Sequence, residues 1–119
     1  MKSVLLIEDE KFIRDIYRTK FKEAKIRLFE AISTKEADNI LDEKTIDLII
    51  LDLILPKENG LDYLKRIRER GVSAPVVILS NLEGKSYRER AKELGAKKYL
   101  LKTDVTPSEF VKLIKNYLL

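Results

Sequence analysis

The chain has 119 residues, 45% of them hydrophobic and 37% charged, a balance typical of one folded domain over residues 1–119. It contains neither cysteine nor histidine, which excludes disulfides, thiolate or imidazole metal sites, and catalysis by either residue. No apolar run is long enough to cross a membrane and no signal segment opens the chain, so we expect a cytoplasmic protein. Any chemistry must therefore come from carboxylates, lysines and hydroxyls.

The net charge of +4 is unevenly distributed along the chain. Residues 1–82 contain 15 basic and 15 acidic residues, whereas residues 83–119 contain nine and five. The whole excess therefore lies in the last third, which suggests an acidic partner for one end of the molecule. A solvated basic surface explains the same excess more simply.

Apolar β-rich runs alternate with segments whose apolar residues recur at helical spacing. In chain order we predict strand 3–7, helix 11–24, strand 26–31, helix 34–43, strand 48–51, helix 61–71, strand 76–79, a helix that ends at Gly95, strand 99–101 and helix 107–118. Right-handed crossovers between such strands give a parallel sheet with helices on both faces. The sequence therefore predicts an α/β fold of the (βα)₅ type.

Residues typical of helix ends support two of these helices. Ser33 and Glu36 have the spacing of a capping box at the start of the second helix. Thr106 and Glu109 repeat that spacing around Pro107, and together they form the strongest helix start in the chain.

Polar side chains follow four of the predicted strands at the point where each strand ends. They are Glu8 and Asp9, then Asp52, then Ser80 and Asn81, and finally Lys102. Because parallel strands all end at one edge of the sheet, we expect these residues to be neighbours. Asp52 stands out because a lone carboxylate between apolar residues costs several kcal/mol unless something pairs with it.

The expected neighbours of Asp52 suggest a chemistry. Glu8, Asp9 and Asp52 would repel one another, and a divalent cation would relieve that repulsion. Oxygen ligands favour Mg²⁺. With Lys102 as a fixed positive charge and Ser80 as a hydroxyl donor, this is the equipment of phosphoryl transfer, and Asp52 is the candidate nucleophile.

The combination of these residues with the (βα)₅ pattern carries a family resemblance. The residues are Glu8, Asp9, Asp52, Pro56, Gly60, Ser80, Tyr99 and Lys102. Over essentially its whole length the chain resembles the receiver domain of two-component response regulators, in the manner of a stand-alone, chemotaxis-type regulator. The resemblance implies a flavodoxin-like three-layer sandwich with a parallel sheet of strand order 2-1-3-4-5.

The resemblance also implies that Asp52 accepts a phosphoryl group from the phosphohistidine of a sensor kinase or phosphotransfer protein. Mg²⁺, with Mn²⁺ as a substitute, would be bound by Asp9, Asp52 and the backbone carbonyl of Ile54, and Glu8 would act largely through water. Such a chain catalyses only its own phosphorylation and dephosphorylation, and it is not an enzyme toward other substrates.

The same resemblance assigns a switch. Ser80, Asn81 and Lys102 would bind the phosphoryl oxygens, Ser80 would move toward them, and Tyr99 would swing inward. The fourth helix, fifth strand and fifth helix would then change as a surface for a downstream protein, or for a phosphorylation-dependent homodimer. A phosphoryl group brings about −1.5 to −2 charges, enough to bias a two-state loop.

The first predicted helix has a basic face. In the family this helix commonly docks the histidine-bearing helices of the partner, which makes the face a predicted docking surface. Its members are Lys11, Arg14, Arg18 and Lys22.

Several positions depart from the family pattern. Thr103 stands where proline usually follows the lysine, so the peptide bond before it is expected to be trans or strained. Asn81 is larger than the small residue common at its position. Ile54 and Leu82 replace frequent polar residues and cannot orient a water molecule, which predicts a long-lived phosphoryl group.

Other functions fit less well. An aspartate-based phosphatase or mutase would need an acid where Ile54 stands, and a flavin or nucleotide module would need a glycine- or hydroxyl-rich loop in place of Glu8 and Asp9. A degenerate receiver used only for docking, and a basic nucleic-acid-binding module, remain the alternatives. Taken singly, each polar residue could also be only a cap, a core residue or a solvated side chain.

Overall fold

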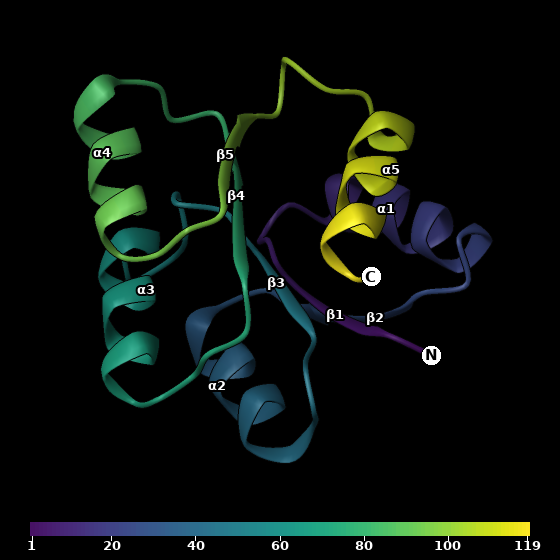
Figure 1. The fold of residues 1–119 in the computed structure, drawn as a ribbon, viewed down its shortest axis with the longest axis horizontal. Helices are drawn as coiled ribbons and strands as arrows, with labels where there is room; N and C mark the ends of the chain where they lie inside the picture. Colours follow the sequence, from purple (N-terminus) through teal and green to yellow (C-terminus); the bar gives the residue numbers. More distant parts are fainter.

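The computed structural model describes all 119 residues as one five-stranded parallel sheet flanked by helices (Figure 1). The strand order is β2-β1-β3-β4-β5, which confirms the predicted topology. The elements are β1 (Ser3–Ile7), α1 (Lys11–Glu23), β2 (Arg27–Ala31), α2 (Thr34–Glu43), β3 (Leu48–Leu51), α3 (Gly60–Glu69), β4 (Val76–Ser80), α4 (Lys85–Glu93), β5 (Lys98–Leu101) and α5 (Pro107–Tyr117).

The side chains of the central strands alternate between two cores, one on each face of the sheet. Val4 and Leu6 of β1 pack with Phe21 of α1 and Phe110 of α5, whereas Leu5 and its neighbours face the other side. That second core is covered by α2, α3 and α4, so the molecule has three layers (Figure 1). Because β1, β3 and β4 are buried on both faces, their runs are apolar without alternation, as parallel sheets require.

The element boundaries differ from the sequence predictions by one or two residues. β2 begins at Arg27 instead of Ile26, because the Ile26 N–H still bonds the Phe21 carbonyl at the end of α1. β4 continues to Ser80, and β5 begins earlier, at Lys98. No helix combines the length and the apolar character needed to cross a membrane.

The helix caps also follow the sequence, with one difference. Thr106 and Glu109 form the predicted capping box, and hydrogen bonds from Thr106 hold the pKa of the Glu109 carboxyl below its usual value. At α2, Ser33 accepts from the Glu36 N–H as expected. The Glu36 carboxylate, however, accepts from the N–H of Ile32 at 3.0 Å, one residue earlier than a capping box would have it.

Gly60 lets the first residue of α3 pack against the backbone of the segment that follows β3. Its N–H donates to the Leu53 carbonyl at 2.9 Å. A Cβ at this position would lie 2.5 Å from the Asp52 carbonyl oxygen and 2.6 Å from the Leu53 Cα. The backbone approach that places Asp52 therefore requires a glycine here.

We predict that Gly60→Ala lowers the free energy of unfolding by about 3 kcal/mol, because backbone atoms cannot move aside as a flexible side chain can. Gly71→Ala is the matched control. Its Cβ would meet nothing within 4 Å, so that only the positive φ of +94° opposes it, at about 1 kcal/mol. Urea unfolding followed by circular dichroism measures both, and equal losses would contradict the steric argument.

Candidate functional site

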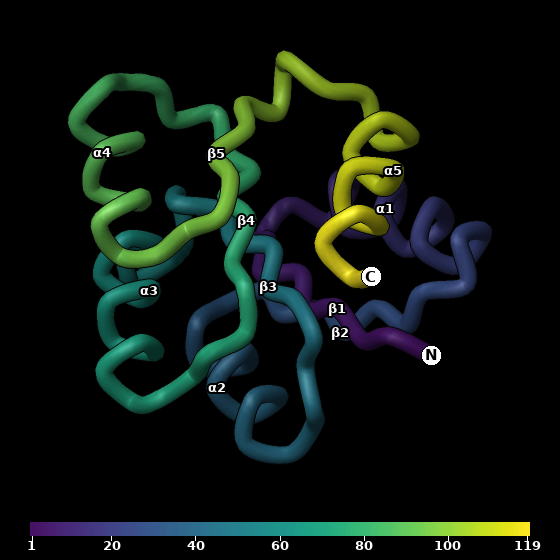
Figure 2. The backbone as a smooth tube through the Cα atoms, in the orientation of Figure 1, coloured from purple at the N-terminus to yellow at the C-terminus, as the bar shows by residue number.

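The predicted site residues lie together where the strands end. The backbone hydrogen bonds of the sheet continue one residue past three strands: Glu8 N–H to Ala31, Asp52 N–H to Ile7, and Lys102 N–H to Ser80. The loops that follow these strands leave the sheet at one edge, toward the top of Figure 2. The sheet itself therefore fixes the starting point of each functional side chain.

Asp52 is buried, 3% exposed, and its carboxylate has three hydrogen-bond donors. Ser80 Oγ donates to Oδ1 at 2.7 Å, and the Ile54 N–H donates to the same oxygen at 3.1 Å. Lys102 Nζ donates to Oδ2 at 2.9 Å. These contacts are what make a carboxylate in this apolar setting tolerable.

Glu8 is even more deeply buried than Asp52, and it shares the same lysine. Its Oε1 lies 2.6 Å from Lys102 Nζ, and its Oε2 accepts from the Glu10 N–H at 3.1 Å. Burial raises the pKa of Glu8 to about 7, against the pull of Lys102, and the charge of Asp52 adds to the rise. Burial alone would lower the pKa of Lys102, but its bonds to Glu8 and Asp52 outweigh burial and raise it. The site therefore carries more negative charge than one lysine balances.

The carboxylates also offer a set of metal ligands. One oxygen each from Glu8, Asp9 and Asp52 lies within 4.8 Å of the others. The Asp9 carboxylate is exposed and has no hydrogen-bond or ion-pair partner in the protein. The Ile54 carbonyl likewise accepts no hydrogen bond. Hard oxygen donors around excess negative charge fit Mg²⁺ or Mn²⁺.

A chain of hydrogen bonds connects Asp52 to Tyr99. Ser80 Oγ, which donates to Asp52, accepts from the Leu82 N–H at 3.3 Å, and the Leu82 carbonyl accepts from the Tyr99 hydroxyl. Tyr99 is half-buried, and the Arg88 guanidinium of α4 lies over its ring at 4.8 Å. The side chain of Asn81, in contrast, is exposed and makes no polar contact within the protein. The peptide bond between Lys102 and Thr103 is trans.

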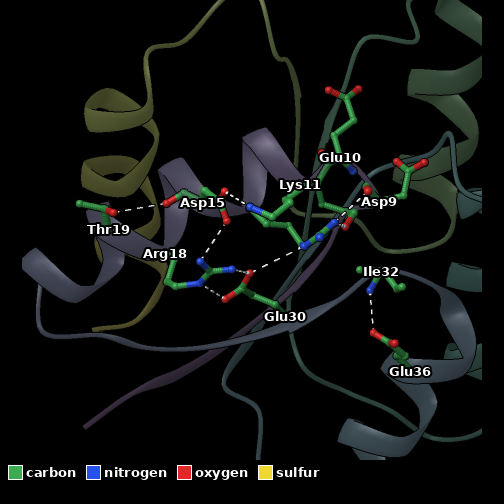
Figure 3. Close-up of polar contacts among 11 residues, drawn as sticks. Asp9, Glu10, Lys11, Asp15, Arg18, Thr19, Glu30, Ile32 and Glu36 are labelled. Atoms are coloured by element: carbon green, nitrogen blue, oxygen red, sulfur yellow. Dashed lines mark hydrogen bonds and ion pairs between the residues drawn. The ribbon is translucent and has the colours of Figure 1, made fainter.

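The basic residues predicted as a docking face do not form one free surface. Figure 3 shows Arg18 and Lys11 beside acidic side chains: Arg18 binds Glu30 through two nitrogens, and Lys11 pairs with Asp15 at 2.8 Å. Arg14 turns inward, and Lys22 alone has no ion pair. Their charges are therefore largely neutralised within the protein.

Sequence reasoning overlooked two features of α1. Phe12 is 72% exposed, although large apolar side chains usually lie inside, and it falls outside the apolar series of the helix. That break in the periodicity was the available signal. Arg14 binds the carbonyls of Glu8 and Asp9, a contact that no sequence pattern indicates.

Comparison with known proteins identifies the family. The family model for the response regulator receiver domain matches residues 4–115. The chain belongs to this family. Receiver domains are parts of two-component systems, and the predicted recognition and fold are thereby confirmed.

Individual relatives agree with that assignment. The chain is 33% identical over 99 residues to the transcriptional regulatory protein PhoP of Escherichia coli K12, covering 83% of this chain but 44% of that protein. It is 28% identical to the receiver domain of Francisella response regulator 1452, with a TM-score of 0.90 over 99% of this chain and 97% of the other. The non-phosphorylated HemR receiver domain of Leptospira biflexa gives the same identity and score, over 99% and 94%. The chain thus spans less than half the length of the PhoP protein.

We predict that Lys102→Met destabilises the protein by about 3 kcal/mol at pH 8, because it leaves two buried carboxylates without their cation. Lys98→Met is the control: it removes an exposed lysine of β5 that forms no ion pair, and it should cost less than about 0.5 kcal/mol. Urea unfolding without divalent cations measures both changes. Similar values would mean that the Lys102 contacts contribute little to stability.

Proposed function

We propose that this receiver domain is a phosphorelay response regulator in which Asp52 accepts a phosphoryl group from a histidine kinase or phosphotransfer protein. The contacts around Asp52 carry this proposal. An ammonium lies at 2.9 Å and a hydroxyl at 2.7 Å from its two oxygens, with carboxylate oxygens of Glu8 and Asp9 within 4.8 Å. The hydroxyl, the ammonium and the carboxylate oxygens that phosphoryl transfer needs thus lie around one candidate nucleophile.

In the proposed step a carboxylate oxygen of Asp52 attacks phosphorus as the bond from phosphorus to the donor imidazole breaks. The electron pair of that bond returns to the nitrogen, and because the other ring nitrogen of the phosphohistidine carries a proton, the histidine leaves as a neutral ring. The attacking oxygen gives up a hydrogen bond to Ser80 or Lys102, and the released donor is then placed to bind a phosphoryl oxygen. Asn81 borders the same loop and would contact the group from the solvent side.

A divalent cation held by Glu8, Asp9, Asp52 and the Ile54 carbonyl would supply the positive charge that lets a phosphoryl group approach three acids. Mg²⁺ is the proposed ion, with Mn²⁺ as a substitute. Lys102 alone serves both Glu8 and Asp52, and this shortage of positive charge supports the proposal.

The switch follows from the hydrogen-bond chain between Ser80 and Tyr99. If Ser80 Oγ turns to a phosphoryl oxygen, it loses its present bond to Asp52, and the Leu82 carbonyl that holds Tyr99 is displaced. Helix α4 has a single buried residue, Ala91, so few contacts oppose its movement. We therefore propose the α4–β5–α5 face as the output surface for protein partners.

The charge of this face indicates the kind of partner. A hollow between α4 and β5 is lined by Arg88, Lys92, Lys97 and Lys98 and by no acid. These residues gather part of the basic excess of the last third of the chain. The hollow fits an acidic protein segment, and its single-sign charge opposes a homodimer built by this hollow upon itself.

On the input side we retain α1 as the docking surface for the histidine-bearing partner. Exposed Phe12 and the unpaired Lys22 are the members that the structure leaves available, while Lys11, Arg14 and Arg18 are engaged within the protein. We place this exchange in the cytoplasm, as the family membership suggests, and propose residues 1–119 as one receiver unit.

We predict one added phosphoryl group by intact mass after incubation with acetyl phosphate and Mg²⁺. Asp52→Asn removes the nucleophile and should abolish the adduct. Asp42→Asn, at an exposed acid of α2, should keep it. A parent chain without adduct would favour the docking-only alternative, and an adduct that persists in Asp52→Asn would locate the nucleophile elsewhere.

We further predict that the phosphoryl group decays slowly, since neither Ile54 nor Leu82 can orient an attacking water molecule. The Ile54 side chain is 54% exposed at the rim of the site, so a polar replacement there meets no packing obstacle. Ile54→Asn should lose the adduct several-fold faster in Mg²⁺ buffer, and Ile54→Leu should decay like the parent. Equal or faster decay of the parent relative to Ile54→Asn would contradict the idea.

A further inference from the structure

Arg14 contacts the backbone of residues 8–10, the acidic loop between β1 and α1, rather than the carboxylates of that loop. Its Nη1 donates to the Asp9 carbonyl at 2.8 Å and to the Glu8 carbonyl at 3.1 Å. The side chain is 14% exposed, which separates it from the other basic residues of α1. An arginine with this burial and these partners is built into the fold.

The two carbonyls belong to the residues that offer carboxylates at the edge of the sheet. Glu8 is held in addition by its N–H bond to Ala31 and by its carboxylate contacts with Lys102 and Glu10. Asp9 has no such support, because its carboxylate is exposed and points away from the ion pairs of α1 (Figure 3). The position of the Asp9 carboxylate is therefore set through its backbone, and Arg14 is the side chain that holds that backbone.

Arg14 is itself oriented by a neighbouring ion pair. Glu30 on β2 lies 3.8 Å from Arg14 Nε. Its carboxylate also binds Arg18 at 2.6 and 2.7 Å (Figure 3). A carboxylate held by two bonds from Arg18 is a fixed point against which Arg14 packs. The acidic loop, α1 and β2 are thus joined in one network.

We propose that Arg14 is a positioning residue for the divalent-cation site of the proposed phosphoacceptor, acting through the Glu8 and Asp9 backbone. It holds the loop so that the Asp9 carboxylate faces Asp52, and it occupies both loop carbonyls so that only carboxylates of this loop face the cation. This inference rests on the proposed function, and it gives Arg14 a role different from docking.

The sign of the effect separates positioning from simple charge. A cation near a Mg²⁺ site repels Mg²⁺, so deleting Arg14 should tighten Mg²⁺ binding if only charge matters. If Arg14 positions the ligands, its deletion should weaken binding, because loss of a supporting group around a metal site costs about 10-fold or more in affinity. The two ideas therefore predict changes in opposite directions.

The test compares the Mg²⁺ dissociation constants of the parent, Arg14→Ala, Arg14→Lys and Lys20→Ala by calorimetric titration. We expect Arg14→Ala to weaken binding about 10-fold. Arg14→Lys keeps the positive charge and supplies a shorter hydrogen-bond donor, so it should recover part of the lost Mg²⁺ affinity. Lys20→Ala removes an equal charge from the last turn of α1, where the side chain takes no part in the network around Arg14, and it should leave binding unchanged or slightly tighter. Unchanged or tighter binding by Arg14→Ala would overturn the inference.

A second measurement separates positioning from loss of folding. Acetyl phosphate labelling of Arg14→Ala should be slow at low Mg²⁺ and should approach the parent rate as Mg²⁺ saturates, whereas an unfolded chain would not recover. A labelling rate that stays low at saturating Mg²⁺ in a folded variant would also contradict the inference. If the parent itself binds no Mg²⁺ and gives no adduct, the proposed function fails instead, so the two failures are distinguishable.

Discussion

This site depends on the ion pairs that Lys102 forms with two buried carboxylates, Glu8 and Asp52. Glu8 and Asp52 are 1% and 3% exposed, and Lys102 lies within 2.9 Å of both. Burial of like charges is unfavourable unless a cation compensates it. When Glu8 is ionised, Lys102 is one charge against two, so the arrangement is stable yet still short of positive charge. The proposed binding of a divalent cation and a phosphoryl group needs that combination.

The strands and helices around the site hold Glu8, Asp52 and Lys102 in place. Three short strands, buried on both faces, carry the acids and Ser80 to one edge, and their hydrogen bonds continue into the functional residues themselves. Gly60 lets α3 start against the Asp52 backbone. The apolar strands are thus both the core of the molecule and the support of the site, because the same residues fix the register of the sheet.

The two sides of the sheet differ in how firmly their helices are held near the site. Helix α1 packs through Tyr17 and Phe21 and is tied to the acidic loop and to β2 by Arg14, Arg18 and Glu30. Helix α4 has one buried residue and contacts Tyr99 through Arg88. The proposed cation site is thus tied to the firmly held α1, and the proposed output surface includes the loosely held α4, which suits the proposed binding at one place and change at another.

Most of the fold and of the site could be predicted from the sequence, because both depend on which types of residue follow one another along the chain. Uninterrupted apolar runs indicated the buried strands, and a polar residue after each run marked the edge where Asp52, Ser80 and Lys102 meet. Element ends such as that of β2 were less accurate, since they depend on which carbonyl each N–H finds. The family comparisons then confirmed the receiver assignment, while the roles of individual residues remain proposals.

The sequence by itself determined the fold class, the candidate nucleophile and the acids beside it, because periodicity marks where each strand ends and the sequence shows which residue follows it. Only the tertiary structure decided the partners of long side chains. Lys11, Arg14, Arg18 and Lys22 look alike as a helical face, yet Arg14 reaches two carbonyls and Arg18 reaches Glu30 on β2. A long flexible side chain has several groups within reach, and which one it binds is set by how helix and sheet pack against each other.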